Sequence, residues 1–195
     1  LEPSFGGGDF LLPVVDRLLA SYEKTGASPA EAAEALTPCI RAVEIHAATF
    51  ASTRALLVNR LTTWGLPTID AARLVDVWLC QDDFLLAELD GPFDAVVGNP
   101  PYVRQERIPS ALMTAYRKRY KTIYDRADLY VPFYERCLDL LGEGGRLGFI
   151  CANRWIKNKY GGPLRAKVSK AFDLLFYIDM ENVDAFQTEV IAFFF

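Results

Sequence analysis

The stretch FDAVVGNPPYVRQE, residues 93–106, contains both a core strand and the most informative polar residues of the chain. Its first part, FDAVVGN, is an apolar run of the length expected for a buried strand. Asn99, two prolines and Tyr102 follow this run directly. Because consecutive prolines fix the backbone φ angle, the stretch predicts a rigid elbow that carries an amide and a phenol at the end of a strand.

Apolar strands and helices alternate along the rest of the chain. Further strands are expected at residues 40–45, 146–153, 173–180 and 189–195, and within residues 74–86, where the strand runs into an acidic turn with Asp82 and Asp83 at its end. Helices are expected at residues 10–26, 28–36, 47–64, 108–120, 129–141 and 162–172. This alternation predicts an α/β fold with a mostly parallel, Rossmann-like sheet covered by helices on both faces. Leu1 to Ser4 resemble the end of a strand, so the first strand of the sheet is expected to be truncated.

The composition favours one globular domain over residues 1–195, because 51% of the residues are hydrophobic. No apolar run approaches the roughly 20 residues of a membrane span, and the N-terminus lacks the features of a signal peptide. We therefore expect a cytoplasmic protein with no membrane partner. The only histidine, His46, has no metal-binding or triad pattern around it, so no metal is expected.

Polar residues follow several of the expected strands, where open parallel sheets bind their ligands. The loop SFGGGD (4–9) lacks the third glycine of G-x-G-x-x-G, so a dinucleotide loop, another nucleoside site and a plain turn all fit it. Glu44 suits the ribose hydroxyls of an adenosine, or is simply a solvated acid. Asp83 suits an adenine amino group or a turn, and Asp82 is the better candidate for the turn.

The elbow itself has a specific chemical interpretation. An aryl amine is a poor nucleophile because its lone pair is delocalised into the ring. The side-chain carbonyl of Asn99 and the backbone carbonyl of Pro100 can accept the two N–H bonds and localise that pair, while Pro101 keeps the backbone rigid. Tyr102 offers a flat face on which an extruded base can stack.

These motifs resemble the DNA adenine-N6 methyltransferases, the N-P-P-Y amino-methyltransferases found in restriction-modification and phage-defence systems. LEPSFGGGDFL resembles the family's first motif, RAVEI its ribose-binding acid, QDDFLL its adenine-binding turn and GNPPY its catalytic motif. The resemblance covers nearly the whole chain. It implies the class I S-adenosylmethionine-dependent methyltransferase fold, with seven strands, and transfer of a methyl group to adenine in double-stranded DNA with base flipping.

The resemblance also implies roles for individual residues. Glu2, Pro3, Gly6 and Gly8 would border the methionine half of S-adenosylmethionine. Glu44 would bind the ribose, and Ile45, Asp83 and Phe84 would contact the adenine. Phe186, in VDAFQTEV, would supply a second aromatic face to the flipped base, although a core phenylalanine fits equally well. The family's upstream segment and its target-recognition domain or subunit are expected to lie outside this segment.

Basic residues follow the elbow and the strand at 146–153. They are candidates for contacts with DNA phosphates, or else form a solvated helix face. They comprise Arg104, Arg107, Arg117, Lys118, Arg119, Lys121, Arg154, Lys157 and Lys159, of which the preferred candidates are Arg104, Arg107, Arg117, Lys118 and Lys157. The net charge of −4 argues against nucleic-acid binding over the whole surface but permits such a local patch.

Three other functions compete with this prediction. A methyltransferase of the same fold can act on another planar nitrogen, such as a protein glutamine, an RNA guanine or cytosine N4, but cytosine enzymes usually have serine at the position of Asn99. A catalytically silent subunit that binds DNA or a partner is disfavoured by the intact motif at residues 99–102. A nicotinamide dehydrogenase leaves that motif unexplained.

Overall fold

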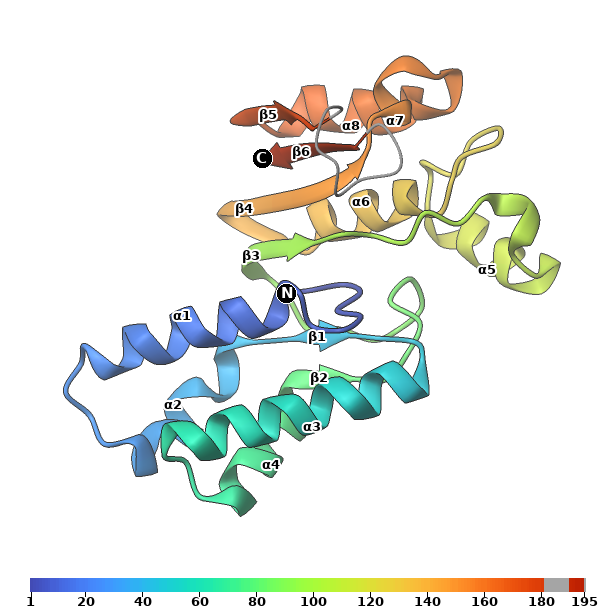
Figure 1. Ribbon diagram of the computed structural model, residues 1–195. Coiled ribbons are helices and arrows are strands. Elements are labelled where there is room, and N and C mark those ends of the chain that lie inside the picture. The colour runs from blue at the N-terminus through green and yellow to red at the C-terminus, as the bar shows by residue number, and fades with distance from the viewer. Residues whose placement is uncertain (181–189, 195) are drawn as a thin grey trace. The chain divides into compact units, whose positions relative to one another are not determined.

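The computed structural model describes residues 1–180 and 190–194. The chain forms two compact units, Leu1–Phe84 (unit 1) and Leu85–Phe195 (unit 2), and each is described by itself. Both combine strands with helices, as Figure 1 shows.

Unit 1 has a small parallel sheet with helices packed around it. Its elements are α1 (Leu11–Glu23), η1 (Pro29–Glu31), α2 (Ala32–Leu36), η2 (Thr37–Cys39), β1 (Ala42–Val43), α3 (Ala47–Trp64), α4 (Thr68–Trp78) and β2 (Leu79–Cys80). Leu11, Val15 and Leu19 recur every fourth residue along α1, so they form one buried stripe. They share a core with Leu57 and Leu61 of α3.

The strands of unit 1 set the position of the first loop. Glu2 forms a parallel bridge with Ala42 of β1, and β1 pairs in parallel with β2. Backbone hydrogen bonds from Glu2 to the Arg41 carbonyl and from Phe5 to the Val43 carbonyl, 2.9 and 3.1 Å long, hold the chain alongside β1. The loop at residues 4–9 therefore begins at the carboxyl end of this strand pair.

The expected strand at residues 74–86 is largely wrong. Leu74, Val75 and Trp78 belong to helix α4, and only Leu79 and Cys80 form a strand. The buried residues Ala71, Leu74, Val75 and Trp78 are spaced three or four apart, which is the period of a helix face. Gly65 ends helix α3 and Pro67 directly precedes helix α4, so these two residues separate two helices.

Unit 2 is built on a four-stranded sheet with the order β3-β4-β6-β5. Its elements are β3 (Phe93–Gly98), η3 (Gln105–Arg107), α5 (Ser110–Arg119), α6 (Tyr130–Asp139), β4 (Leu141–Ala152), α7 (Arg154–Lys157), η4 (Lys159–Gly161), α8 (Gly162–Ala171), β5 (Phe176–Asp179) and β6 (Val190–Phe194). β3 and β4 are parallel, whereas β6 runs antiparallel to both β4 and β5. The elbow after β3 therefore lies at the carboxyl end of the one parallel strand pair described in this sheet, β3 and β4.

The glycine-rich sequence GEGG at residues 142–145 lies within the bounds of β4. Phe93 pairs with Leu141 and Ala95 with Arg146, so four residues of β4 lie opposite the single residue Asp94 and form a bulge. Gly144 adopts a φ of 73°, which permits this bulge. Beyond it the register is regular and ends with Gly98 opposite Phe149.

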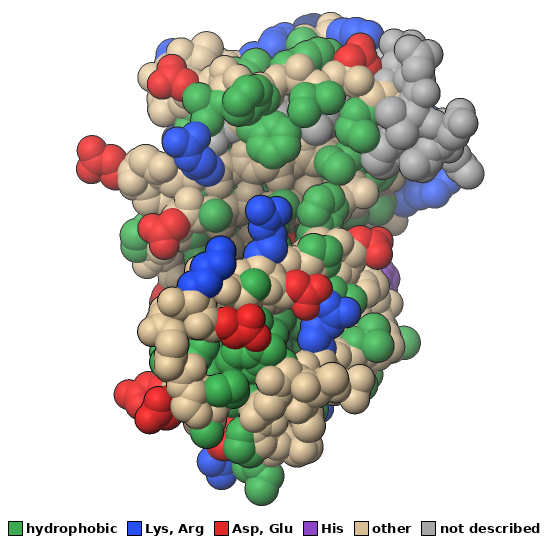
Figure 2. All heavy atoms as spheres, turned by 60° about the vertical axis from the view of Figure 1, so that its left-hand side comes forward, with side chains coloured by type: hydrophobic (Ala, Val, Ile, Leu, Met, Phe, Trp, Pro, Cys, Tyr) green, Lys and Arg blue, Asp and Glu red, His purple; other side chains and the backbone are tan. Residues whose placement is uncertain are grey.

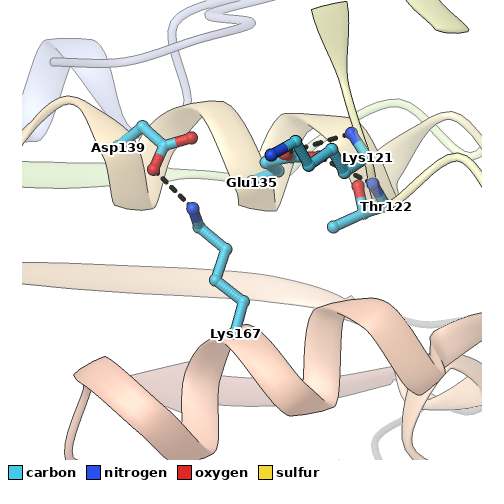
Figure 3. Close-up of polar contacts among 5 residues, drawn as sticks. All are labelled: Lys121, Thr122, Glu135, Asp139 and Lys167. Atoms are coloured by element: carbon cyan, nitrogen blue, oxygen red, sulfur yellow. Dashed lines mark hydrogen bonds and ion pairs between the residues drawn. The ribbon is translucent and has the colours of Figure 1, made fainter.

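Two acidic residues of helix α6 contact the segment after α5 and helix α8 (Figure 3). The carboxylate of Glu135, which is buried, accepts hydrogen bonds from the backbone N–H groups of Lys121 and Thr122 at 3.2 and 2.8 Å. Asp139 forms an ion pair with Lys167 of α8. Glu135 thereby supplies acceptors for two backbone N–H groups after α5 that would otherwise lack a hydrogen-bond partner.

The surface carries charges of both signs. On the face shown in Figure 2, Lys and Arg side chains are interspersed with Asp and Glu. Within residues 1–180 and 190–194, no helix has both the length and the apolar character needed to cross a membrane.

We predict that Glu135→Gln lowers the free energy of unfolding by about 1–3 kcal/mol, because the new NH₂ group cannot accept one of the two buried backbone N–H bonds. Urea denaturation measures this difference. Glu143→Gln, an equivalent change at an exposed position, is the matched control and should change stability by less than about 0.5 kcal/mol. Equal effects of the two substitutions would contradict this role for Glu135.

Candidate active site

Glu2 is a buried acid at the start of the first loop. Only 3% of the residue is exposed, and its Oε2 atom has no hydrogen-bond partner among the residues that the structure describes. The pKa of Glu2 is raised to about 8, chiefly by burial; the N-terminal amine opposes this rise, and the negative charges of Asp9 and Glu44 add to it. The carboxyl group is therefore largely neutral at pH 7, and a cation brought next to it would ionise it.

The loop at residues 4–9 contains two glycines with a left-handed backbone conformation. Gly6 and Gly8 have φ angles of 49° and 89°, in the left-handed region that glycine adopts without strain. A Cβ atom at Gly8 would lie 3.1 Å from Leu12 Cγ and 3.2 Å from Thr53 Cγ2. A Cβ atom at Gly6 or Gly7 would meet no described atom within 4 Å, so this side of the loop has room for a ligand.

Glu44 organises the same loop. Its Oε2 atom accepts a hydrogen bond from the Gly6 N–H at 3.0 Å, and its Oε1 atom accepts one from the His46 N–H at 2.8 Å. A carboxylate has about four acceptor positions, so these two bonds leave capacity for two hydroxyl groups. This geometry suits the predicted ribose-binding acid and excludes the alternative of a freely solvated acid.

Thr53 was not predicted as a site residue. Its Oγ1 atom donates a hydrogen bond to the Gly6 carbonyl at 2.9 Å, so Glu44 and Thr53 hold both backbone polar groups of Gly6. Thr53 shares the buried stripe of α3 with Leu57 and Leu61. A polar residue on an otherwise apolar stripe was the available signal, but the sequence does not reveal its distant partner.

The remaining predicted cofactor residues differ in exposure. Ile45 is 53% exposed, Asp83 is half-buried, and Pro3 and Phe84 are buried. Asp82 has the expected turn role, because its Oδ1 atom accepts a hydrogen bond from the Asp83 N–H at 2.7 Å.

In unit 2, the elbow after β3 brings Asn99 and Tyr102 together. The Tyr102 hydroxyl donates to Asn99 Oδ1 at 2.6 Å and also lies 3.1 Å from the carbonyl oxygen of Ile150 on β4. Asn99 is exposed, whereas Pro100 is buried and anchors the backbone. The two prolines and the sheet together fix the position of the Asn99 carboxamide.

The Tyr102 ring contacts one buried aromatic ring and is partly exposed. Its centroid lies 6.3 Å from that of the buried Tyr130, and 45% of the residue is exposed. The Leu129 N–H donates to the Val103 carbonyl at 2.8 Å, which ties the elbow to the start of α6. Burial raises the pKa of the Tyr102 hydroxyl well above its usual value, so the group remains a proton donor.

Two of the predicted basic residues of unit 2 form hydrogen bonds within the protein, and the preferred phosphate candidates are all exposed. Arg119 donates to the Leu86 carbonyl at 2.7 Å and Arg117 to Gln105 Oε1 at 3.0 Å, so both have partners within the protein. The structure leaves the following predicted phosphate contacts exposed: Arg104, Arg107, Arg117, Lys118 and Lys157. Phe186, the predicted second aromatic, lies outside the described residues.

Within the described part of the chain, no three His, Cys, Asp or Glu side chains are grouped as a metal site would require.

Comparison with known proteins identifies the family. The Eco57I restriction-modification methylase family matches residues 44–186. The chain is 55% identical over 193 residues to the Type II methyltransferase M.PaeR7I of Pseudomonas aeruginosa and 52% identical over 193 residues to M.XhoI of Xanthomonas vasicola. Each alignment covers 99% of this chain but only 33% and 35% of the relative, so the chain spans about a third of their length.

The fold is also similar to that of solved methyltransferase structures. A Listeria monocytogenes protein described as a class I S-adenosylmethionine-dependent methyltransferase superposes with a TM-score of 0.66 at 15% identity, over 99% of this chain and 51% of the other. The expected fold class is confirmed, although the described strands form two sheets and do not establish seven strands in one. Family and fold together support S-adenosylmethionine as the cofactor. The chain belongs to the Eco57I restriction-modification methylase family.

Proposed function

We propose that this chain is the catalytic part of a DNA methyltransferase that transfers a methyl group to the N6 amine of adenine. The main support is the elbow after β3, where a rigid backbone holds the Asn99 carboxamide beside the half-exposed ring of Tyr102. The relatives M.PaeR7I and M.XhoI are Type II methyltransferases, which supports DNA as the substrate.

The proposed role of the elbow is to activate the amine. Asn99 Oδ1 and the Pro100 carbonyl accept the two N–H bonds of the target, so its lone pair is localised on nitrogen and directed at the methyl donor. Because Pro100 and Pro101 restrict the backbone, little reorganisation is needed when the amine arrives. No covalent intermediate with the protein is involved, and the amine loses its proton to water.

Tyr102 is proposed to receive the base. A methyltransferase cannot reach the adenine amine inside a duplex, so the nucleotide must be flipped out. The exposed face of the Tyr102 ring can stack against the flipped adenine while Tyr130 supports the other side. We place Phe186 as the second stacking residue because of its motif.

The residues of unit 1 fit S-adenosylmethionine. The buried Oε2 atom of Glu2, which has no partner in the described structure, suits the methionine ammonium group. The glycine loop has space on the side where a Cβ atom at Gly6 meets no described atom, and Glu44 has acceptor capacity for the ribose. When bound, the cofactor supplies a methyl group on an electrophilic sulfonium.

The other predicted contacts complete this proposed cofactor site. Pro3 and Gly8 would shape the methionine end, and Ile45, Asp83 and Phe84 would contact the adenine end. All of these residues belong to unit 1, whereas the amine-activating residues belong to unit 2.

DNA is the proposed partner of unit 2. Arg104, Arg107, Lys118 and Lys157 are exposed cations that can contact phosphates, and Arg117 can do so if it leaves Gln105. Sequence recognition is proposed to depend on a target-recognition domain or subunit elsewhere, because the relatives are about three times as long as this chain.

The decisive experiment is transfer of labelled methyl from S-adenosylmethionine to DNA by the full-length protein, followed by nucleoside analysis. We expect N6-methyladenine, reduced at least about a hundredfold in Asn99→Ala because an acceptor aimed at the reacting amine is lost. Asn59→Ala, at an exposed position of α3, is the matched control. Label in cytosine, RNA or protein would overturn the substrate, and an active Asn99→Ala protein would overturn the mechanism.

Cofactor binding should release a proton from Glu2. The free carboxyl, with a pKa of about 8, is protonated at pH 7, and the cationic ammonium lowers that pKa, so affinity should rise as the pH approaches 8. Calorimetry at pH 7 in buffers of different ionisation enthalpy should detect about one more released proton for the wild type than for Glu2→Gln. Equal proton release by both proteins would contradict the assignment.

Thr53→Val should weaken cofactor binding by about three- to tenfold, because the Gly6 carbonyl loses its buried donor. Thr53→Ser, which retains the hydroxyl, should bind with nearly wild-type affinity. Thr62→Val, on the exposed side of the same helix, is the control, and calorimetry provides the measurement. Wild-type affinity in Thr53→Val would show that Glu44 holds the loop alone.

A further inference from the structure

The Tyr102 hydroxyl lies within hydrogen-bonding distance of two carbonyl oxygens. Asn99 Oδ1 is 2.6 Å away and the Ile150 backbone oxygen is 3.1 Å away. A phenol has one proton, so at any moment it donates to one of these two acceptors. The shorter oxygen–oxygen distance identifies Asn99 Oδ1 as the preferred acceptor of the Tyr102 proton.

The second acceptor has a fixed position. Ile150 is part of β4, where it pairs with Ala192 of β6, and the preceding Phe149 pairs with Gly98 at the end of β3. The Tyr102 ring is placed by its contact with Tyr130. Rotation about the phenol C–O bond can therefore move the proton from one carbonyl to the other while the ring and the sheet remain in place.

The orientation of the Asn99 carboxamide matters for the proposed chemistry. Only its oxygen can accept an N–H bond from the target amine, and a half-turn of the side chain would present an NH₂ group that repels it. Donation from Tyr102 favours the orientation with the oxygen in place. Because burial raises the pKa of this phenol, it remains protonated over the working range of pH.

We infer that the Tyr102 hydroxyl is a positioning group with two hydrogen-bonding states. Without a base it donates to Asn99 Oδ1 and holds the amide oxygen toward the incoming amine. When the amine arrives, the hydroxyl proton turns to the Ile150 carbonyl and Asn99 Oδ1 accepts the amine instead. This inference rests on the proposed function and divides Tyr102 into a ring that stacks and a hydroxyl that orients Asn99.

A purely structural role makes a different prediction. If the hydroxyl only anchors the ring, its removal should impair stacking, so that DNA affinity and base flipping change. If it orients Asn99, its removal should slow methyl transfer and leave both unchanged. The two roles can therefore be separated by measuring flipping and chemistry in the same protein.

The test is Tyr102→Phe in the full-length protein, with Tyr124→Phe, an exposed tyrosine of unit 2, as the matched control. Single-turnover methyl transfer is measured beside the fluorescence of 2-aminopurine at the target position and the dissociation constant for DNA. We expect transfer to slow about tenfold, as for the loss of one hydrogen bond, while flipping and DNA affinity change less than about twofold. Tyr124→Phe should match the wild type in all three measurements.

Two results would overturn the inference while leaving the proposed function intact. One is a Tyr102→Phe protein that transfers methyl at the wild-type rate. The other is a protein whose slower transfer is matched by an equal loss of flipping or DNA affinity, which would show that the hydroxyl anchors the ring. A wild-type protein that forms no N6-methyladenine would overturn the proposed function, and the inference with it.

Discussion

The parallel pairing of β3 with β4 is the constraint on which the geometry of the proposed catalytic motif, residues 99–102, depends. Gly98, the last residue of β3, lies opposite Phe149, so the chain leaves β3 beside Ile150. The two prolines that come after Asn99 have no backbone N–H, so they cannot extend the ladder. Tyr102 thereby reaches both the Asn99 side chain and the Ile150 carbonyl. Without this register, the hydrogen bond to Ile150 could not form.

Unit 1 uses strand pairing for a different purpose. The bridge between Glu2 and Ala42 places the first loop beside the end of β1, where Glu44 follows. Glu44 can then accept from the Gly6 N–H, and Thr53 of the next helix can donate to the Gly6 carbonyl. Side chains from two later segments hold a backbone that glycine alone would leave free.

The sequence predicted the elements that depend on local pattern. The helix at residues 47–64 and the strand that begins at Phe93 and ends at Gly98 agree with the sequence-based expectation. The strand expected at residues 74–86 was wrong because a helix face of Ala71, Leu74, Val75 and Trp78 gives a dense apolar run that also suits a buried strand. Gly65 and Pro67, which precede this run, are compatible with the start of either a helix or a strand.

Other parts of the site depend on contacts between distant residues, so local pattern could not predict them. The Thr53 to Gly6 bond joins residues 47 positions apart, and the Tyr102 to Ile150 bond joins residues 48 apart. Motif spacing assigned Tyr102 a stacking role from its ring, but its hydroxyl acquires a second role only from the register of β4. The sequence pattern also singled out Glu44 as a candidate. Its hydrogen bond with the Gly6 N–H joins residues far apart in the chain, so only the folded structure reveals it.

Burial makes the two groups proposed to handle ligands neutral, with opposite consequences. The pKa of Glu2 is raised to about 8 by loss of water, so a buried acid can remain uncharged until a cation arrives to stabilise its ionised form. The pKa of Tyr102 is raised as well, and here neutrality preserves the proton that holds Asn99. Unit 1 thus gains a charge when its proposed ligand binds, whereas unit 2 keeps its charge and exchanges one hydrogen bond for another. Loss of water therefore matters more in unit 1, where it keeps a carboxyl group neutral until a cationic ligand binds, than in unit 2, where a phenol is neutral at pH 7 in any case.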